Sequence, residues 1–118
     1  MIKSFKELII WQKSVELSPA VYKATKKFPK EELFGLVFQM KRSAISIPSN
    51  IAEGRSRNTK KDFVQFLKIA SGSLSELETQ VIISFKLKFI DKSENDNITD
   101  RIFEINKMLN SMIYKLNS

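Results

Sequence analysis

The fold is indicated most clearly by residues 59–87, which read TKKDFVQFLKIASGSLSELETQVIISFKL. Apolar side chains recur there every three or four residues, and this spacing puts them on one face of an α-helix. That face comprises Phe63, Leu67, Ala70, Leu74, Leu77, Val81 and Phe85. Thr59, with Asp62 three residues later, is a typical helix N-cap. The pattern predicts one long helix over residues 59–87 with a single apolar seam.

Another long helix is predicted at the start of the chain, over residues 4–27. Ser4 and Glu7 have the spacing of a capping box, which marks the beginning of a helix. Phe28 and Pro29 end the helix, because the residue before a proline is pushed out of the helical conformation.

Two further segments complete the helical pattern. One covers residues 30–53 and ends at Gly54, since glycine commonly follows a helix C-terminus. A basic loop over residues 55–58 joins it to the next helix. The last helix follows a polar link at residues 91–97, begins within residues 93–97 and continues to about residue 116.

Together the four segments predict an all-α protein: an antiparallel up-down-up-down four-helix bundle, in one domain over residues 1–118. Only 3 Gly and 3 Pro interrupt the pattern. Pro19 and Pro48 fall inside predicted helices, where each removes one backbone hydrogen bond, so we expect kinked long helices. Helix breaks at these prolines are the alternative, which the continuous apolar spacing disfavours.

The two N-terminal helices carry more apolar surface than one bundle core requires. Beside its core stripe, the helix over residues 4–27 has a second stripe: Leu8, Trp11, Val15 and Tyr22. The helix over residues 30–53 has Leu33 in its core stripe and, on another side, Phe34, Phe38 and Ile45. Apolar surface of this width is typical of self-association, so we expect a homo-oligomer. A thick core with partly exposed aromatic side chains is the alternative.

The composition argues against catalysis. The 118 residues include no cysteine and no histidine, which excludes thiolate chemistry, the usual general base and the commonest metal ligands. The serines have no activating base nearby in the sequence. We therefore expect a protein without enzymatic activity and without a cofactor or metal. No targeting or membrane-spanning segment is visible, which predicts a cytoplasmic protein that does not enter the membrane.

The whole chain has a formal net charge of +7. Positive charge is concentrated in its first part. Residues 1–68 hold 14 Lys and Arg against 6 Asp and Glu, whereas residues 69–118 hold 6 against 7. The cations form two clusters that antiparallel helices would place at opposite ends: Lys23, Lys26, Lys27 and Lys30 in one, and Arg55, Arg57, Lys60 and Lys61 in the other. Neither cluster is interleaved with aromatic residues, so contacts to backbone phosphates are expected rather than base stacking. A lysine-rich, merely solvated surface is the alternative.

A polar stripe accompanies the apolar ones on the helix over residues 30–53. Its members are spaced by three and four residues: Gly35, Gln39, Arg42, Ser46, Ser49 and Glu53, with Ser43 and Asn50 at the edge. Polar side chains between two apolar stripes are expected to be half-buried. The stripe is either a ligand or phosphate site centred on Arg42, or a polar layer that pairs this helix with another helix or subunit, and we favour the second interpretation.

These residues also resemble a known family, the bacterial four-helix bundle proteins encoded in 23S ribosomal RNA intervening sequences. The most specific stretch is residues 39–54, QMKRSAISIPSNIAEG. It is accompanied by the motifs Trp11-Gln12-Lys13, Glu32-x-Phe34-Gly35-Leu36-x-x-Gln39 and Phe66-Leu67-x-Ile69-Ala70-x-Gly72-Ser73-Leu74. The family motif corresponds in this chain to Gln39, Arg42, Ser46, Asn50, Glu53, Gly54 and Arg57.

The resemblance implies a four-helix bundle without an established enzymatic activity. Some relatives form homopentamers, which favours a pentamer here. The family is similar to the accessory variability protein of diversity-generating retroelements, a basic pentamer that partners a reverse transcriptase and is implicated in nucleic-acid binding. A protein partner such as a reverse transcriptase is therefore also an expectation.

The sequence thus predicts a non-enzymatic, self-associating four-helix bundle that binds RNA or DNA through backbone phosphates. The alternative is a protein-binding scaffold or adaptor with no role in nucleic-acid binding.

Overall fold

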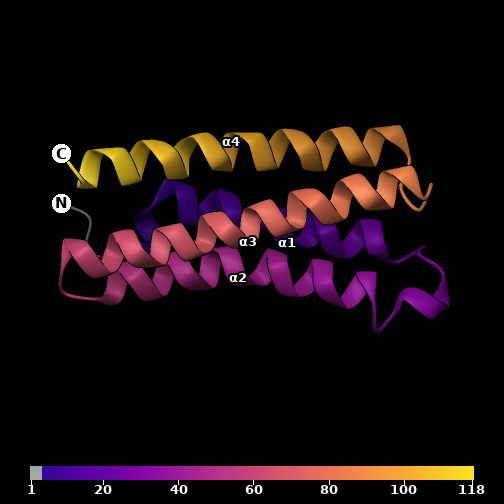
Figure 1. Ribbon diagram of the computed structural model, residues 1–118, viewed down its shortest axis with the longest axis horizontal. Helices are drawn as coiled ribbons and strands as arrows, with labels where there is room; N and C mark the ends of the chain where they lie inside the picture. The colour runs from indigo at the N-terminus through magenta and orange to yellow at the C-terminus, as the bar shows by residue number, and fades with distance from the viewer. Residues whose placement is uncertain (1–3) are drawn as a thin grey trace.

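The computed structural model describes residues 4–118 and contains, within that range, four α-helices in an antiparallel up-down-up-down arrangement (Figure 1). They are α1 (Ile9–Thr25), α2 (Leu36–Ser56), α3 (Lys60–Lys86) and α4 (Lys92–Leu116). Two short 3-10 helices precede α1 and α2: η1 (Phe5–Glu7) and η2 (Lys30–Glu32). The bundle is 44 Å long, and η1 and the C-terminal end of α4 lie at the same end as the α2–α3 connection (Figure 1). The all-α bundle predicted from the sequence is confirmed.

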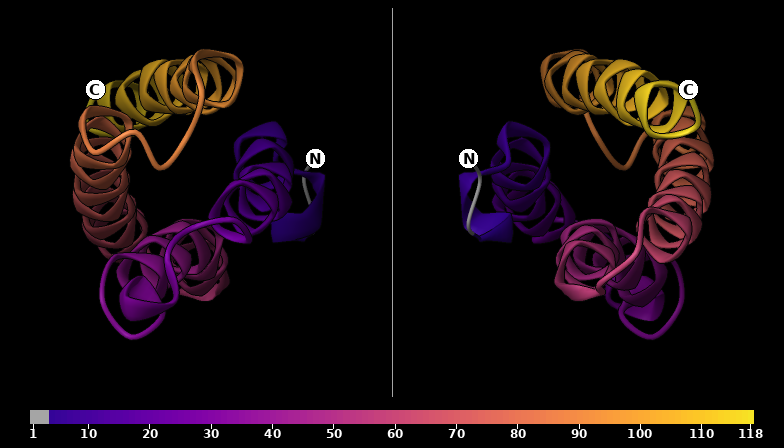
Figure 2. Two further views of the ribbon diagram at one scale, coloured as in Figure 1. Left: turned by 90° about the vertical axis from the view of Figure 1, so that its right-hand side faces the viewer. Right: turned by 90° about the vertical axis from the view of Figure 1, so that its left-hand side faces the viewer.

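The four helices follow one another around a shared core, with each packed against its neighbours in the chain and α1 packed against α4 (Figure 2). The predicted seams supply this core. Its largest fully buried side chains are Ile10, Leu17, Met40, Ile47, Ile51, Leu67, Leu74, Leu77, Ile98, Ile105, Leu109 and Val21. Leu33 and Phe85 were assigned to these seams but are exposed. Leu33 precedes α2, and the core position in the last turns of α3 is occupied by Ser84, which is fully buried against Met40. Pro19 and Pro48 both lie inside continuous helices, so neither breaks its helix.

The start of α1 differs from the prediction. Ser4 does not begin the long helix; its hydroxyl accepts a hydrogen bond from the Lys6 amide (3.2 Å) and caps η1. Leu8 is extended and separates this turn from α1. The turn places the Phe5 ring edge-on against Trp11, with ring centroids 5.3 Å apart. This apolar contact between residues on either side of Leu8 accounts for the break that the capping signal alone did not reveal.

The bounds of α2 also differ at both ends. Residues 30–35 do not join the helix, because η2 is followed by Gly35 with φ −110° and ψ −108°. At the other end α2 continues through Gly54 to Ser56, so Gly54 is not the residue that ends the helix. A Cβ built at position 54 would lie 2.6 Å from the Phe66 Cβ. Glycine is therefore needed there for the close approach of α2 to α3.

The last two helices begin at well-defined caps. Thr59 accepts a hydrogen bond from the Asp62 amide (3.1 Å), which confirms the predicted start of α3. The predicted polar link over residues 91–97 is wrong, because Asp91 and Glu94 form a capping box and α4 already begins at Lys92. The short turn before it contains Lys88 in the left-handed conformation, with φ 64°. No helix within residues 4–118 is long and apolar enough to span a membrane.

Candidate nucleic-acid interface

The loop cluster, consisting of Arg55, Arg57, Lys60 and Lys61, lies around the α2–α3 connection at one end of the bundle. Arg55 is half-buried and the other three are exposed. Lys60 and Lys61, in the first turn of α3, form no ion pair with any residue of the described range. Within this range, Lys60 and Lys61 therefore present unpaired ammonium groups to solvent, which suits contact with phosphate groups.

Arg57 is held more firmly than the lysines. Its Nε and Nη2 atoms lie 3.2 Å and 3.1 Å from Oε2 of Glu53, one helical turn earlier. Its guanidinium also stacks over the Phe66 ring, 5.0 Å from the ring centroid. Because the pair with Glu53 is exposed, it fixes the direction of the side chain more than it stabilises the fold.

Two shallow hollows flank this connection. One has a volume of about 380 Å³ and is lined by Ser4, Phe5, Arg55, Ser56, Arg57 and Asn58. The other, of about 300 Å³, is lined by Arg55, Arg57, Asn58, Thr59, Lys60 and Phe63. Arg55, Arg57 and Asn58 line both hollows, and we call these three shared residues the ridge.

The second predicted cluster lies at the opposite end of the bundle, as expected from antiparallel helices. Lys23, Lys26 and Lys30 are exposed. Lys27 differs, because its Nζ lies 2.8 Å from Glu94 and 3.8 Å from Asp91. The hydrogen bond to Glu94 raises the pKa of Lys27 above its ordinary value. Its charge is thus partly matched within the protein, as that of Arg57 is by Glu53, whereas Lys23, Lys26 and Lys30 form no ion pair within residues 4–118.

Lys88 joins this second cluster, and the sequence analysis missed it. With Lys27, it lines a hollow of about 530 Å³ beside Phe89 and Ile90. The two lysines are 61 positions apart in the chain, and they meet because the α1–α2 and α3–α4 connections share one end of an antiparallel bundle. That topological argument was the signal that could have identified Lys88.

The polar stripe divides into two parts. The Ser46 and Ser73 hydroxyls are 2.8 Å apart, and Asn50 Nδ2 donates to the Ser46 carbonyl (2.8 Å) and hydroxyl (2.9 Å). Ser46 and Asn50 therefore join α2 to α3, as a helix-pairing layer would. By contrast, Gln39, Arg42 and Glu53 are exposed in the single chain, so they do not belong to the layer between α2 and α3. Their pairing with another subunit stays a prediction.

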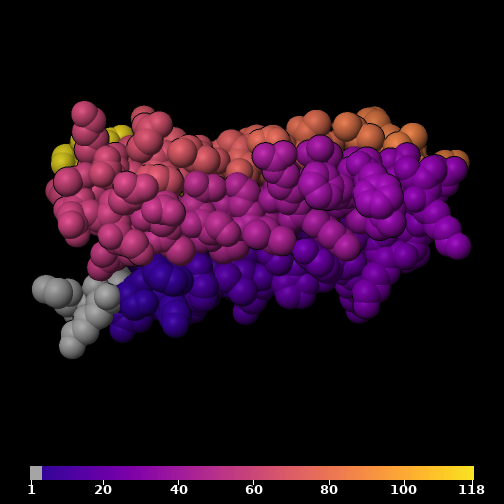
Figure 3. All heavy atoms as spheres, turned by 90° about the horizontal axis from the view of Figure 1, so that it is seen from below, coloured from indigo at the N-terminus to yellow at the C-terminus, as the bar shows by residue number. Residues whose placement is uncertain are grey.

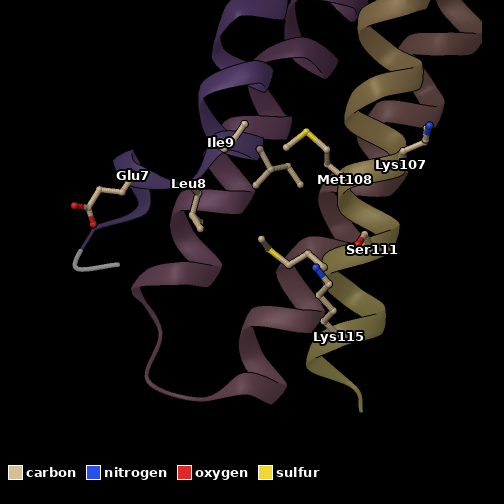
Figure 4. A pocket seen from close by; sticks show the side chains of 9 residues that line it. Glu7, Leu8, Ile9, Lys107, Met108, Ser111 and Lys115 are labelled. Carbon is tan, nitrogen blue, oxygen red and sulfur yellow. The ribbon is translucent and has the colours of Figure 1, made fainter. Parts of the chain in front are cut away.

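An apolar cleft opens between the start of α1 and the last turns of α4, at the same end as the loop cluster (Figure 4). Figure 4 shows Leu8 and Ile9 on one side, with Met108 facing them from the other. Lys107, Ser111 and Lys115 follow one another along α4 at the rim of the cleft, whose volume is about 470 Å³. With an apolar interior, the cleft is suited to binding rather than to acid–base chemistry.

Segments of α1 and α2 lie side by side on the face seen in Figure 3. Part of their wide apolar arcs remains exposed. Phe34 is 88% exposed and Phe38 is 52% exposed, and Ile45, Val15 and Tyr22 are also exposed. The ammonium group of Lys41 lies 4.5 Å from the centroid of the Tyr22 ring, so exposed side chains of α1 and α2 are in contact at this point. Leu8 and Trp11 of the predicted second stripe are instead largely covered by the chain itself. We call the uncovered part, Val15, Tyr22, Phe34, Phe38 and Ile45, the α1–α2 face.

Comparison with known proteins identifies a family and a similar solved structure. The model of the family described as 23S rRNA-intervening sequence protein matches residues 6–111. The chain is also similar to the crystal structure of a protein of unknown function from the S23 ribosomal protein family of Bacteroides thetaiotaomicron. The two chains are 28% identical with a TM-score of 0.80, and the match covers 89% of this chain and 98% of that one. No curated protein matches the chain.

Proposed function

The chain belongs to the 23S rRNA-intervening sequence protein family, and we propose that it is a non-enzymatic, self-associating protein that binds nucleic acid through backbone phosphates. The observation that carries this proposal is the loop cluster: four cations around one exposed helix connection, two of them without an anionic partner in the described chain. Lysine and arginine side chains of this kind supply most of the sequence-independent affinity of proteins for nucleic acids.

The net charge supports the same proposal. A formal charge of +7 on 118 residues produces a field that attracts polyanions and speeds their association. If five copies assemble, as in some relatives, the particle carries +35 and repeats the loop cluster five times. Several weak phosphate contacts on one particle then act together, which raises the overall affinity well above that of a single cluster.

Self-association is supported by the α1–α2 face. Phe34 and Phe38 expose large aromatic surfaces beside Ile45 on one side of the bundle. Contiguous apolar surface of this kind is uncommon on soluble monomers and is characteristic of interfaces. The homo-oligomer buries this face, while the loop cluster at the end of the bundle stays accessible.

A protein-binding scaffold with no nucleic-acid role is the second candidate. The apolar cleft favours it, since Met108 and Met112 line the cleft and methionine-rich surfaces adapt to the apolar side chains of different partners. The cleft and the loop cluster involve different residues, so the two functions make separate predictions.

The deciding experiment compares two variants that lose the same charge at different places. The loop variant carries Arg55→Gln, Arg57→Gln, Lys60→Gln and Lys61→Gln, and the control variant carries Lys68→Gln, Lys86→Gln, Lys107→Gln and Lys115→Gln. Binding of single-stranded RNA and of duplex DNA is measured by fluorescence anisotropy at low salt. We expect the loop variant to lose much more affinity than the control. Equal losses would contradict a specific role of the loop cluster, and no binding by the wild type would favour the scaffold.

A further inference from the structure

The ridge at the α2–α3 connection is shared by two hollows that are large enough for small ligands. Their volumes, about 380 Å³ and 300 Å³, are at the lower end of the range for small-molecule sites. A flat cationic surface would be sufficient for phosphate contact alone. The hollows offer space beside the cations that phosphate contact alone does not require.

Each hollow has an aromatic ring in its wall. Phe5 lines the first and Phe63 lines the second, and both rings are half-buried, so each leaves part of its surface toward solvent. The sequence analysis did not associate aromatic residues with this cluster. Phe5 was missed because η1 brings it beside the ridge from 50 positions away in the chain. Phe63 was missed because the apolar pattern assigned it to the core seam of α3.

The ridge itself carries both charge and hydrogen-bonding capacity. Arg57 is fixed by Glu53 and by the Phe66 ring. Asn58, at the exposed tip of the connection, lines both hollows. A side-chain amide has donors and an acceptor, which match the edges of nucleobases.

We propose that this end of the bundle binds single-stranded nucleic acid, with one base in each hollow, the intervening phosphate on Arg55 and Arg57, and the Asn58 side chain hydrogen-bonded to a base edge. The inference rests on the proposed nucleic-acid binding and specifies the form of its ligand. Unpaired bases can leave the strand and stack on aromatic side chains beside a cationic track. The bases of an intact duplex stay stacked inside the helix and cannot enter the hollows.

Trp11 provides a direct signal for the first hollow. It is the only tryptophan in the chain, and its ring centroid is 5.3 Å from that of Phe5, which lines the hollow. A base that enters the first hollow should therefore change the fluorescence of Trp11. A phosphate bound on the ridge without a base should change it much less.

The test compares strands of about ten nucleotides, within the usual site size for single-strand binding. The probes are an oligouridylate, the oligodeoxythymidylate of equal length, an abasic strand with the same number of phosphates, and a duplex. We expect the base-containing strands to bind at least about fivefold more tightly than the abasic strand, as base stacking on aromatic side chains predicts. They should also change the Trp11 fluorescence. Comparing the affinities of the RNA and DNA strands shows whether the sugar contributes to binding.

Two variants locate the effect. Asn58→Ala changes an exposed loop residue, and Phe63→Leu removes the ring of the second hollow; Phe103→Leu, at an exposed site on α4, is the matched control. Both hollow variants should bind the base-containing strands more weakly and the abasic strand unchanged, while Phe103→Leu should behave as the wild type. Melting curves show whether the variants are folded. If Phe63→Leu does not fold, Asn58→Ala still provides the test.

Two results would overturn the inference in distinguishable ways. Equal affinity for base-containing and abasic strands would contradict base binding in the hollows but would remain consistent with phosphate binding. No binding of any strand or duplex would remove the proposed function as well.

Discussion

Gly54 of α2 and Phe66 of α3 meet so closely that a Cβ at position 54 would lie 2.6 Å from the Phe66 Cβ. The same added atom would lie 3.1 Å from a ring carbon of Phe63. Gly54 directly precedes Arg55 of the loop cluster, so this contact fixes how α2 and α3 approach the connection that carries the proposed site.

Gly54→Ala is therefore expected to destabilise the protein by about 1–3 kcal/mol, because the added methyl group forces the two helices apart. Gly72→Ala is the matched control, since a Cβ at position 72 meets nothing within 4 Å. That substitution should stabilise α3 by up to about 1 kcal/mol, the difference in helix propensity between glycine and alanine. Chemical unfolding monitored by circular dichroism measures both changes. If Gly54→Ala were as stable as the wild type, α2 and α3 would not approach as closely as described.

Arg42→Ala should leave the stability of the single chain within about 0.5 kcal/mol of its starting value, because Arg42 is exposed. Asn50→Ala should instead cost about 1 kcal/mol, since it removes the hydrogen bonds to Ser46. Thermal melting in a Phe38→Glu background separates this effect from any effect on assembly. A loss of more than about 1 kcal/mol for Arg42→Ala would show that Arg42 is buried against the chain itself.

Phe38→Glu and Ile45→Glu should each dissociate the oligomer while preserving the helical fold. Both side chains are exposed on the α1–α2 face, so a carboxylate there does not lower the stability of the single chain. It would, however, be buried when chains assemble through this face, which is unfavourable. Phe103→Glu, which alters a side chain 64% exposed on α4, is the control and should keep the wild-type mass. Light scattering at micromolar concentration measures the masses. A monomeric wild type, or glutamate variants that still assemble, would contradict self-association through this face.

The acid dependence of stability should include a contribution from Lys92 and Asp96. Their hydrogen bond (2.6 Å) lowers the pKa of Asp96 below its ordinary value of 3.8. Because the pKa is lower in the folded chain than in the unfolded one, the contribution is present above about pH 4 and is lost as the pH falls further. The pair is exposed, so high salt should weaken this contribution.

Asp96→Asn should therefore flatten the fall in unfolding free energy between about pH 5 and about pH 2, the interval in which carboxylates titrate. Asp100→Asn is the control, because it removes a carboxylate from the same exposed helix without removing an ion pair of the described chain. Denaturant unfolding at the two pH values provides the measurement. The same pH dependence in both variants would rule out the Lys92–Asp96 contribution.

The sequence predicted those parts of the fold whose causes are local. The bounds of α3 were predicted to within a few residues from Thr59 and the seam beginning at Phe63. This was possible because a helix cap and a helical period depend only on neighbouring positions in the sequence. Gly54 shows where such reasoning fails. Its position suggested a helix end, but the residue is required by Phe66 on another helix, and no local pattern contains that contact.

In the candidate site, too, some features could be predicted from the sequence and others depend on contacts between distant residues. Antiparallel topology alone placed the loop cluster at the opposite end from Lys23 and Lys30. The hollows could not be predicted, because one of them depends on Phe5 returning to the ridge from the start of the chain. The outward direction of Arg42 likewise depends on how α2 is rotated against α3, which a stripe on a single helix does not determine.

The account is tested most directly by the salt dependence of nucleic-acid binding, measured for the wild type and for the loop variant and its control. Log affinity should fall linearly with log salt concentration, with a slope of about 0.7–0.9 for each phosphate contact. Loss of the four cations of the loop cluster should reduce that slope by up to about 3, while the control variant keeps it. An unchanged slope in the loop variant, or no binding by the wild type at about 50 mM salt, would contradict the proposal that this cluster binds backbone phosphates.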